Sequence, residues 1–203
     1  MVSDTHISAT CSIRNKAVCK NGETVFTSDE ANIASFLVEI YKHFELNYTR
    51  FYKMDSLSKL GWLASELLLK DNFDKDKYSP AEVGIVFANA NSSLDSDVKY
   101  MASVSDIPSP ALFVYTLPNI MIGEISIRNQ FKGEAAFFVF ESFDAGFIEQ
   151  YVNNLFNNDI FKVCICGWVD VLGNDYKTVL FLLEKGKGAI PFTADNMNKY
   201  FND

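Results

Sequence analysis

Long apolar runs alternate with amphipathic stretches along this chain, and the alternation predicts a layered α/β domain. The clearest example lies at residues 133–146, with the sequence GEAAFFVFESFDAG. Residues 135–140 are apolar on both faces, which is typical of a strand that is buried on both sides. After Glu141 and Ser142, apolar side chains recur at the spacing of an amphipathic helix, at Phe143, Phe147, Ile148, Tyr151, Val152 and Leu155.

The same periodicities predict further strands at residues 7–18, 83–88, 162–169 and 176–184, with the last two joined as a hairpin by Gly173–Asn174. Further helices are predicted at residues 30–44, with Ser28 or Asp29 as the cap, at 57–68, with Asp55 or Ser56 as the cap, at 94–104 and at 111–129. No linker or internal repeat divides the chain. We therefore expect one domain, residues 1–203, with α/β/α layers, in which a five-stranded mixed sheet that includes strand 135–140 forms the middle layer and has helices on both faces.

Ser142 is the candidate functional residue of this chain, because a strand, a sharp turn and a helix place it at the turn near the helix N-terminus. Such a turn can present a nucleophile, and the end of the helix favours negative charge. The alternative is that Ser142 only caps the helix, since serine is among the preferred N-cap residues. The geometry of the pattern alone leaves both interpretations open.

Composition limits the classes of function. The 203 residues carry a formal charge of −8, which argues against a nucleic-acid partner because such proteins present a basic face. No apolar run reaches the length of about 18 residues that a membrane span needs, and the first ten residues do not read as a signal peptide. These features predict a cytoplasmic protein.

The cysteines predict neither a disulfide nor a metal site. Cys164 and Cys166 lie two residues apart in a predicted strand, which is the spacing of neither a redox CxxC motif nor a common zinc pair. We expect buried, reduced thiols, which behave as small apolar groups. No metal and no cofactor is expected.

Three segments, taken in order, carry a resemblance to a known family. The first is Phe-Tyr-Lys-Met-Asp at residues 51–55 with the helix that follows it. The second runs from Tyr-Thr-Leu-Pro-Asn at 115–119 through Gly-Glu-Ile-Ser-Ile at 123–127 to Phe-Lys-Gly at 131–133. The third is strand 163–171, which contains Gly167. With the spacing from Gly133 through Ser142 to Gly167, residues 50–171 resemble the N-terminal half of β-ketoacyl synthases, which have the thiolase fold.

The chain also departs from that family at the positions that matter for chemistry. The resemblance places Ser142 where active members carry a cysteine nucleophile between small residues, and here its neighbours are Glu141 and Phe143. Active members also use two histidines, or a histidine and an asparagine, from their second half, whereas this chain has no histidine after His43. The resemblance therefore implies a ketosynthase-like protein in which Ser142 occupies the nucleophile position without condensing activity.

The resemblance further implies partners, namely an acyl carrier protein and a full-length ketosynthase. Because dimers of this family pair the strand that leads into the nucleophile turn, we expect a homodimer or a heterodimer that works in fatty-acid or polyketide-type synthesis. Two alternatives remain open at this point. Ser142 could be the nucleophile of an acyltransferase or hydrolase, although a base would have to lie beside it, and the chain could be a binding module without enzymatic activity.

Overall fold

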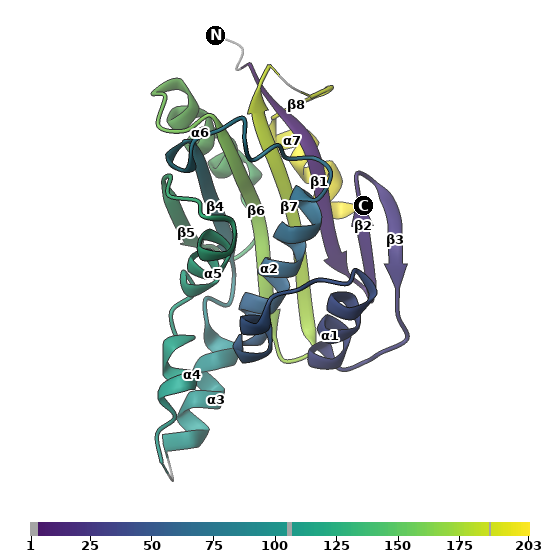
Figure 1. The fold of residues 1–203 in the computed structure, drawn as a ribbon, viewed down its shortest axis with the longest axis vertical. Coiled ribbons are helices and arrows are strands. Elements are labelled where there is room, and N and C mark those ends of the chain that lie inside the picture. The colour runs from purple at the N-terminus through teal and green to yellow at the C-terminus, as the bar shows by residue number, and fades with distance from the viewer. Residues whose placement is uncertain (1–3, 105–106, 187) are drawn as a thin grey trace.

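A mixed β-sheet lies between two layers of helices in the computed structural model, which describes residues 4–104, 107–186 and 188–203 (Figure 1). The strand order is β3-β2-β1-β7-β6-β4-β5, and β8 pairs with β1. Strands β4, β5 and β6 run parallel, whereas the other pairs are antiparallel. The strands are β1 (Thr5–Arg14), β2 (Ala17–Lys20), β3 (Glu23–Thr27), β4 (Val83–Asn89), β5 (Ala135–Val139), β6 (Val163–Leu172), β7 (Asp175–Lys185) and β8 (Ile190–Pro191).

The layered α/β/α architecture with a mixed sheet is confirmed, but the expected number of five strands is wrong because the described residues form eight. The segment predicted as one strand at residues 7–18 is two strands joined at Asn15 and Lys16, which both adopt left-handed backbone conformations. Lysine is a rare residue for that conformation, so this turn gave no clear sequence signal. Strands β3 and β8 are short and partly polar, so no apolar pattern in the sequence indicates them.

Helices on the two faces of the sheet enclose two separate apolar cores. Helices α1, α2 and α5 cover one face, with a core that includes Phe36, Leu60, Ile85, Ile125 and Leu182. Helices α6 and α7 cover the other face, with a core that includes Ile148, Val152, Phe156, Phe181 and Met197. The helices are α1 (Ile33–His43), α2 (Ser56–Leu69), α3 (Leu94–Val104), α4 (Pro110–Val114), α5 (Ile120–Asn129), α6 (Ala145–Asn157) and α7 (Ala194–Asn202), with 3₁₀ turns at Thr49–Lys53 and Pro80–Glu82.

Two predicted helix boundaries differ from the structure. Helix α1 is capped by Asn32 rather than by Ser28 or Asp29, whereas Asp55 caps α2 as predicted. The single helix expected at residues 111–129 is divided into α4 and α5 around Pro118. Proline has no backbone N–H and disfavours a helical conformation in the residue before it, so the helical pattern is interrupted there.

Strand β5 lies in the middle layer, as predicted, and forms one edge of the sheet. It pairs only with β4, and Val139 is 52% exposed. Its two faces are nevertheless partly covered, because Phe137 packs against one core and Phe138 against the other. A continuous apolar run therefore correctly indicates that both faces of the strand meet helices, but it carries no information on whether both edges are paired.

Candidate functional site

The turn that contains Ser142 lies beyond the carboxyl ends of the three parallel strands. It connects β5 to α6 through residues 140–144. Its first residue continues the parallel pairing, because the Phe140 N–H donates to the Asn89 carbonyl oxygen at 2.9 Å. Ligand sites of α/β sheets occur beyond the carboxyl ends of the strands, so this turn occupies the place where a functional site is expected.

Ser142 itself is exposed, and it does not cap α6. The cap is Asp144, whose Oδ1 accepts a hydrogen bond from the Phe147 N–H at 2.8 Å. The N-cap interpretation of Ser142 is therefore wrong. The backbone φ of Ser142 also lies outside the left-handed region. A nucleophile elbow holds its serine in a strained backbone conformation. The φ angle of Ser142 shows no such strain.

Phe143 fixes the turn to the rest of the molecule. Its ring stacks on Phe201 of α7 with 4.4 Å between ring centroids, and it meets the edge of Trp168 at 6.0 Å. The neighbouring Glu141 and Ser142 consequently face solvent while Phe143 points inward. Together with Asn198 of α7, the turn lines an open depression of about 460 Å³.

Chemical groups that could activate Ser142 are not assembled around it. The depression is lined by Phe140, Glu141, Ser142, Phe143, Asp144, Ala145, Gly146 and Asn198, so none of its lining residues in the described chain is a histidine, lysine or arginine. A serine hydroxyl needs an adjacent base to become a nucleophile. Two carboxylates belong to the turn: Glu141, next to Ser142 in sequence, is exposed, and Asp144 already uses its Oδ1 as the helix cap.

Both histidines lie far from this turn. His6 is on β1, which is four strands away from β5 in the sheet. At the usual spacing of about 4.8 Å between strands, that separation is roughly 19 Å. His43 lies near the opposite edge of the sheet, because its ring is 4.6 Å from that of Phe26 on β3, six strands away from β5. The structure therefore brings no histidine to Ser142.

Asp170 is a polar residue of this end of the sheet that sequence reasoning missed. Its Oδ1 accepts from the backbone N–H groups of Ala90 and Asn91, at 3.3 Å and 3.1 Å, and its Oδ2 accepts from the Asn91 side chain at 2.8 Å. Asp170 thus fixes the loop that follows β4. The sequence feature that could have identified Asp170 is a carboxylate near the end of an otherwise apolar strand.

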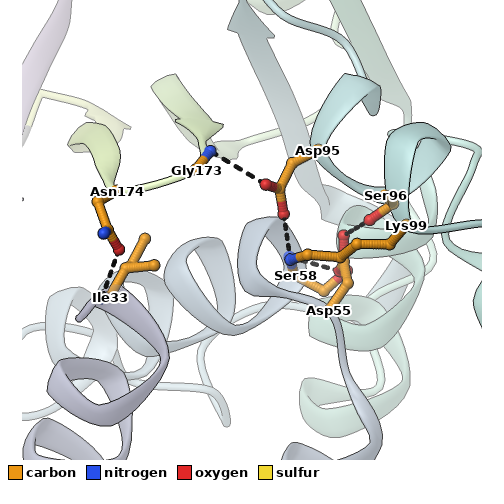
Figure 2. A network of polar contacts seen from close by, with 8 residues as sticks. All are labelled: Ile33, Asp55, Ser58, Asp95, Ser96, Lys99, Gly173 and Asn174. Carbon is orange, nitrogen blue, oxygen red and sulfur yellow. Dashed lines mark hydrogen bonds and ion pairs between the residues drawn. The ribbon is translucent and has the colours of Figure 1, made fainter. Parts of the chain in front are cut away.

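A second polar network ties three helices to the hairpin between β6 and β7 (Figure 2). Asp95 of α3 accepts through Oδ1 from the Gly173 N–H at 3.0 Å and through Oδ2 from Lys99 at 2.6 Å. The Ser96 hydroxyl of α3 donates to Oδ2 of Asp55 at 2.6 Å, while Oδ1 of Asp55 caps α2. The network orients α3 but presents no free group for catalysis.

Among the residues that the structure describes, no three histidine, cysteine, aspartate or glutamate side chains come together as metal ligands would. No helix in the described part of the chain is both long and apolar enough to cross a membrane.

Comparison with known proteins places this fold among ketosynthases. No protein-family model and no curated protein matches the sequence. The ishigamide ketosynthase/chain length factor is similar in structure with a TM-score of 0.65 and 15% identity, over 89% of this chain and 62% of that chain. A type II polyketide acyl-carrier protein in complex with its ketosynthase, AntDE:AntF, matches with a TM-score of 0.59 and 16% identity over the same shares.

A third solved structure is the ketosynthase ApeO in complex with its chain length factor ApeC from Xenorhabdus doucetiae. It matches with a TM-score of 0.58 and 12% identity, over 90% of this chain and 79% of that chain. The chain spans less than two thirds of the length of the first two proteins. The thiolase-like ketosynthase fold implied by the sequence resemblance is thus confirmed.

Proposed function

We propose that this chain is a non-condensing partner subunit of a full-length ketosynthase in fatty-acid or polyketide-type synthesis. The observation that carries the proposal is the open edge of β5, the strand that leads into the Ser142 turn. Proteins of the same fold occur in complexes of a ketosynthase with a chain length factor and of a ketosynthase with an acyl-carrier protein. An acyl carrier protein is accordingly the second proposed partner.

The edge of β5 has the properties of a surface that pairs with another chain. Exposed edges usually carry lysine, proline or a bulge that prevents pairing with a further strand, whereas β5 has the sequence Ala-Ala-Phe-Phe-Val. The Ile85 N–H donates to Glu134 and the Phe140 N–H donates to Asn89. The alternation along a strand then directs the N–H groups of Ala135, Phe137 and Val139 outward.

Aromatic side chains flank this edge on the α6 side. Phe138, Phe140, Phe147 and Tyr151 form a cluster of half-buried rings whose centroids lie 4.9–5.8 Å apart. Aromatic residues are enriched among the side chains that dominate binding energy at protein interfaces. The cluster and the outward N–H groups together offer a partner both apolar contacts and backbone hydrogen bonds.

Association is tested by co-expressing the chain with the full-length ketosynthase of its source organism and measuring the dissociation constant of the purified pair. We expect Val139→Lys to weaken binding at least tenfold, because a lysine at the exposed edge opposes strand pairing. The matched control is Val25→Lys on β3, an exposed valine of the opposite edge strand. Equal effects of the two substitutions, or no binding by the wild-type chain, would overturn the proposal.

Absence of condensing activity is tested by incubating the wild type and Ser142→Cys with acyl- and malonyl-carrier protein, followed by mass spectrometry. We expect no ketoacyl product from either protein, since no histidine, lysine or arginine lines the depression beside residue 142. The cysteine variant should be alkylated by a thiol reagent yet remain unable to condense. A ketoacyl product from the wild type alone would refute the proposal, and a stable acyl adduct on Ser142 would favour the acyltransferase alternative.

A further inference from the structure

A small polar cavity lies between helix α7 and the strands β1, β2 and β3 (Figure 1). Its volume is about 250 Å³, and it shares no lining residue with the depression at Ser142. Polar side chains of the lining include Thr10, Ser12, Arg14, Cys19, Thr24 and Tyr200. A cavity with this volume and lining has room for several water molecules or for one small polar ligand.

Two buried hydroxyl groups of β1 line this cavity. Thr10 is 6% exposed and Ser12 is 9% exposed. Because side chains alternate along a strand, both lie on the same face of β1 as Arg14. Neither hydroxyl makes a hydrogen bond within residues 4–104, 107–186 and 188–203. Buried polar groups are nearly always hydrogen-bonded, so these two hydroxyls point to a partner that enters the cavity.

Two cations at this cavity lack a carboxylate partner. Arg14 donates from one guanidinium nitrogen to the Phe201 carbonyl oxygen at 2.7 Å, which leaves most of its five N–H groups for a ligand. The register that pairs Ile13 with Thr178 places Lys177 beside Arg14, and like charges on neighbouring strands repel each other. In the described chain neither cation lies within 4.0 Å of a carboxylate oxygen.

The acidic groups nearby do not pair with these cations. Asp170 lies opposite Lys177 on β6, but its oxygens accept hydrogen bonds from the loop after β4. Asp203 lines the cavity at its exposed side and forms no ion pair within the described residues. Burial and then the charge of Arg14 lower the pKa of Lys177. An anion at Arg14 would reduce the repulsion between the two cations.

We propose that this cavity binds a phosphate group, whose oxygens are contacted by Arg14 and by the hydroxyls of Thr10 and Ser12. Arginine binds phosphate through two parallel hydrogen bonds, and serine and threonine hydroxyls donate to the remaining oxygens. Inorganic phosphate and the phosphate end of a small monoester share this chemistry, and the volume admits both. The site adjoins β3, at the edge of the sheet opposite to β5, so it is independent of the proposed partner surface.

Binding at this site should also stabilise α7. Arg14 already joins β1 to α7 through the Phe201 carbonyl oxygen, and a bound phosphate would hold the guanidinium in that position. Amide hydrogen exchange in α7 should therefore slow when phosphate is added, whereas exchange in α1, on the other face of the sheet, should not change.

The site is tested by titrating the wild-type chain with inorganic phosphate at constant ionic strength and following its amide signals by NMR. We expect saturable shifts at Thr10, Ser12 and Tyr200, and none with sodium chloride. A parallel titration with sn-glycerol 3-phosphate distinguishes the two sources, because tighter binding than that of phosphate identifies a monoester as the ligand. Absence of saturable phosphate binding, or saturable binding of acetate alone, would overturn the proposal.

The role of the hydroxyls is tested with the double variant Thr10→Val/Ser12→Ala. Hydrogen bonds to charged groups are among the stronger ones, so the dissociation constant for phosphate should rise at least tenfold. Since these hydroxyls bond to nothing in the described chain, the urea midpoint should stay close to that of the wild type. Thr27→Val on the edge strand β3, outside the cavity, is the control and should bind phosphate like the wild type.

The role of the cation is tested with Arg14→Gln, which keeps an N–H donor for the Phe201 carbonyl oxygen but removes the charge. We expect at least a tenfold rise in the dissociation constant. Lys16→Gln removes a positive charge two residues away, outside the cavity, and should have little effect. Equal losses in Arg14→Gln and Lys16→Gln, or wild-type affinity in Arg14→Gln, would show that the cavity is not the phosphate site.

Discussion

Gly167 in the middle of β6 is required by its surroundings. Its φ of +143° lies in a region that side-chain-bearing residues rarely adopt, and a Cβ added there would lie 2.1 Å from the Val179 carbonyl oxygen of the neighbouring strand. Because the obstacle is backbone, it cannot move aside without disturbing the β6–β7 ladder. We therefore expect Gly167→Ala to lower the free energy of unfolding by about 3 kcal/mol or more, measured by urea denaturation.

Gly123 provides the matched control for that substitution. It lies within α5, and a Cβ added to it meets no heavy atom within 4 Å. Alanine is favoured over glycine inside a helix, so Gly123→Ala should raise the free energy of unfolding by about 0.5–1 kcal/mol. Similar losses from both substitutions would show that the close contact at Gly167 is not the cause.

The four cysteines should react very unequally with alkylating reagents. Cys11, Cys164 and Cys166 are buried, whereas Cys19 is half-buried. Burial raises the pKa of the Cys11 thiol to about 12 and also raises the pKa of Cys164. Because the thiolate is the reactive form, iodoacetamide at pH 8 should modify Cys19 alone in the folded protein and all four thiols after denaturation, as counted by mass spectrometry. Rapid modification of a second thiol in the folded state would contradict the burial.

Single residues also mark where sequence reasoning succeeds and where it ends. The position of Ser142 in a turn between a strand and a helix follows from the apolar pattern alone. The choice between Ser142 and Asp144 as the cap does not, because both residue types are good caps and only the path of the chain decides between them. The lack of a histidine near Ser142 likewise depends on the strand order, which places His6 and His43 far away.

At the scale of elements, Glu82 joins the start of β4 to the start of β6. It completes a capping box with Ser79 and forms an ion pair with Lys162. The hydrogen bond from Lys162 and then those from Ser79 lower the pKa of its carboxyl group from 4.5 to about 2. A depressed pKa means that the charged carboxylate stabilises the folded state above pH 4.5 and loses this effect as the pH falls towards 2.

Glu82→Gln should therefore unfold more easily than the wild type at pH 7, and the difference should disappear between about pH 4.5 and pH 2. The measurement is chemical denaturation of both proteins at several pH values. Glu23→Gln, at an exposed glutamate of the edge strand β3, serves as the control. A difference between wild type and Glu82→Gln that does not change with pH would mean that the charge of Glu82 is not involved.

Elements with a strong apolar periodicity could be predicted from the sequence. Features that depend on which elements lie next to each other in the fold could not. Helices α2 and α6 and strands β4, β6 and β7 follow from their apolar spacing and turn residues. The apolar pattern does not show that β5 is an edge strand, because a strand packed between helices is apolar whether or not both of its edges are paired. The exposure of α3 and α4 could not be predicted for a related reason, since their apolar positions have the spacing of a buried face although many of them are exposed.

At the scale of the whole molecule, helices cover both faces of the sheet, whereas its edge strands β3 and β5 each pair with one neighbour. Helix α7 closes the second face through Met197, and its ends are fixed by Glu149, which accepts from the Ala194 N–H at 2.6 Å, and by Arg14, which donates to the Phe201 carbonyl oxygen at 2.7 Å. We therefore expect the proposed partner to meet this protein along its side, at β5, rather than across a face of the sheet.

The place of β7 in the sheet has a consequence for the order in which the newly made chain can fold. It lies between β1 and β6, and Ser12 pairs there with Val179. During synthesis β1 therefore lacks its partner β7 until about 150 residues after β3 have been made, since long-range pairing cannot begin earlier. Ribosome-bound chains stalled after residue 172 should be cleaved quickly by protease, whereas the released chain of residues 1–203 should resist. Early resistance would show that the two parts of the sheet form independently.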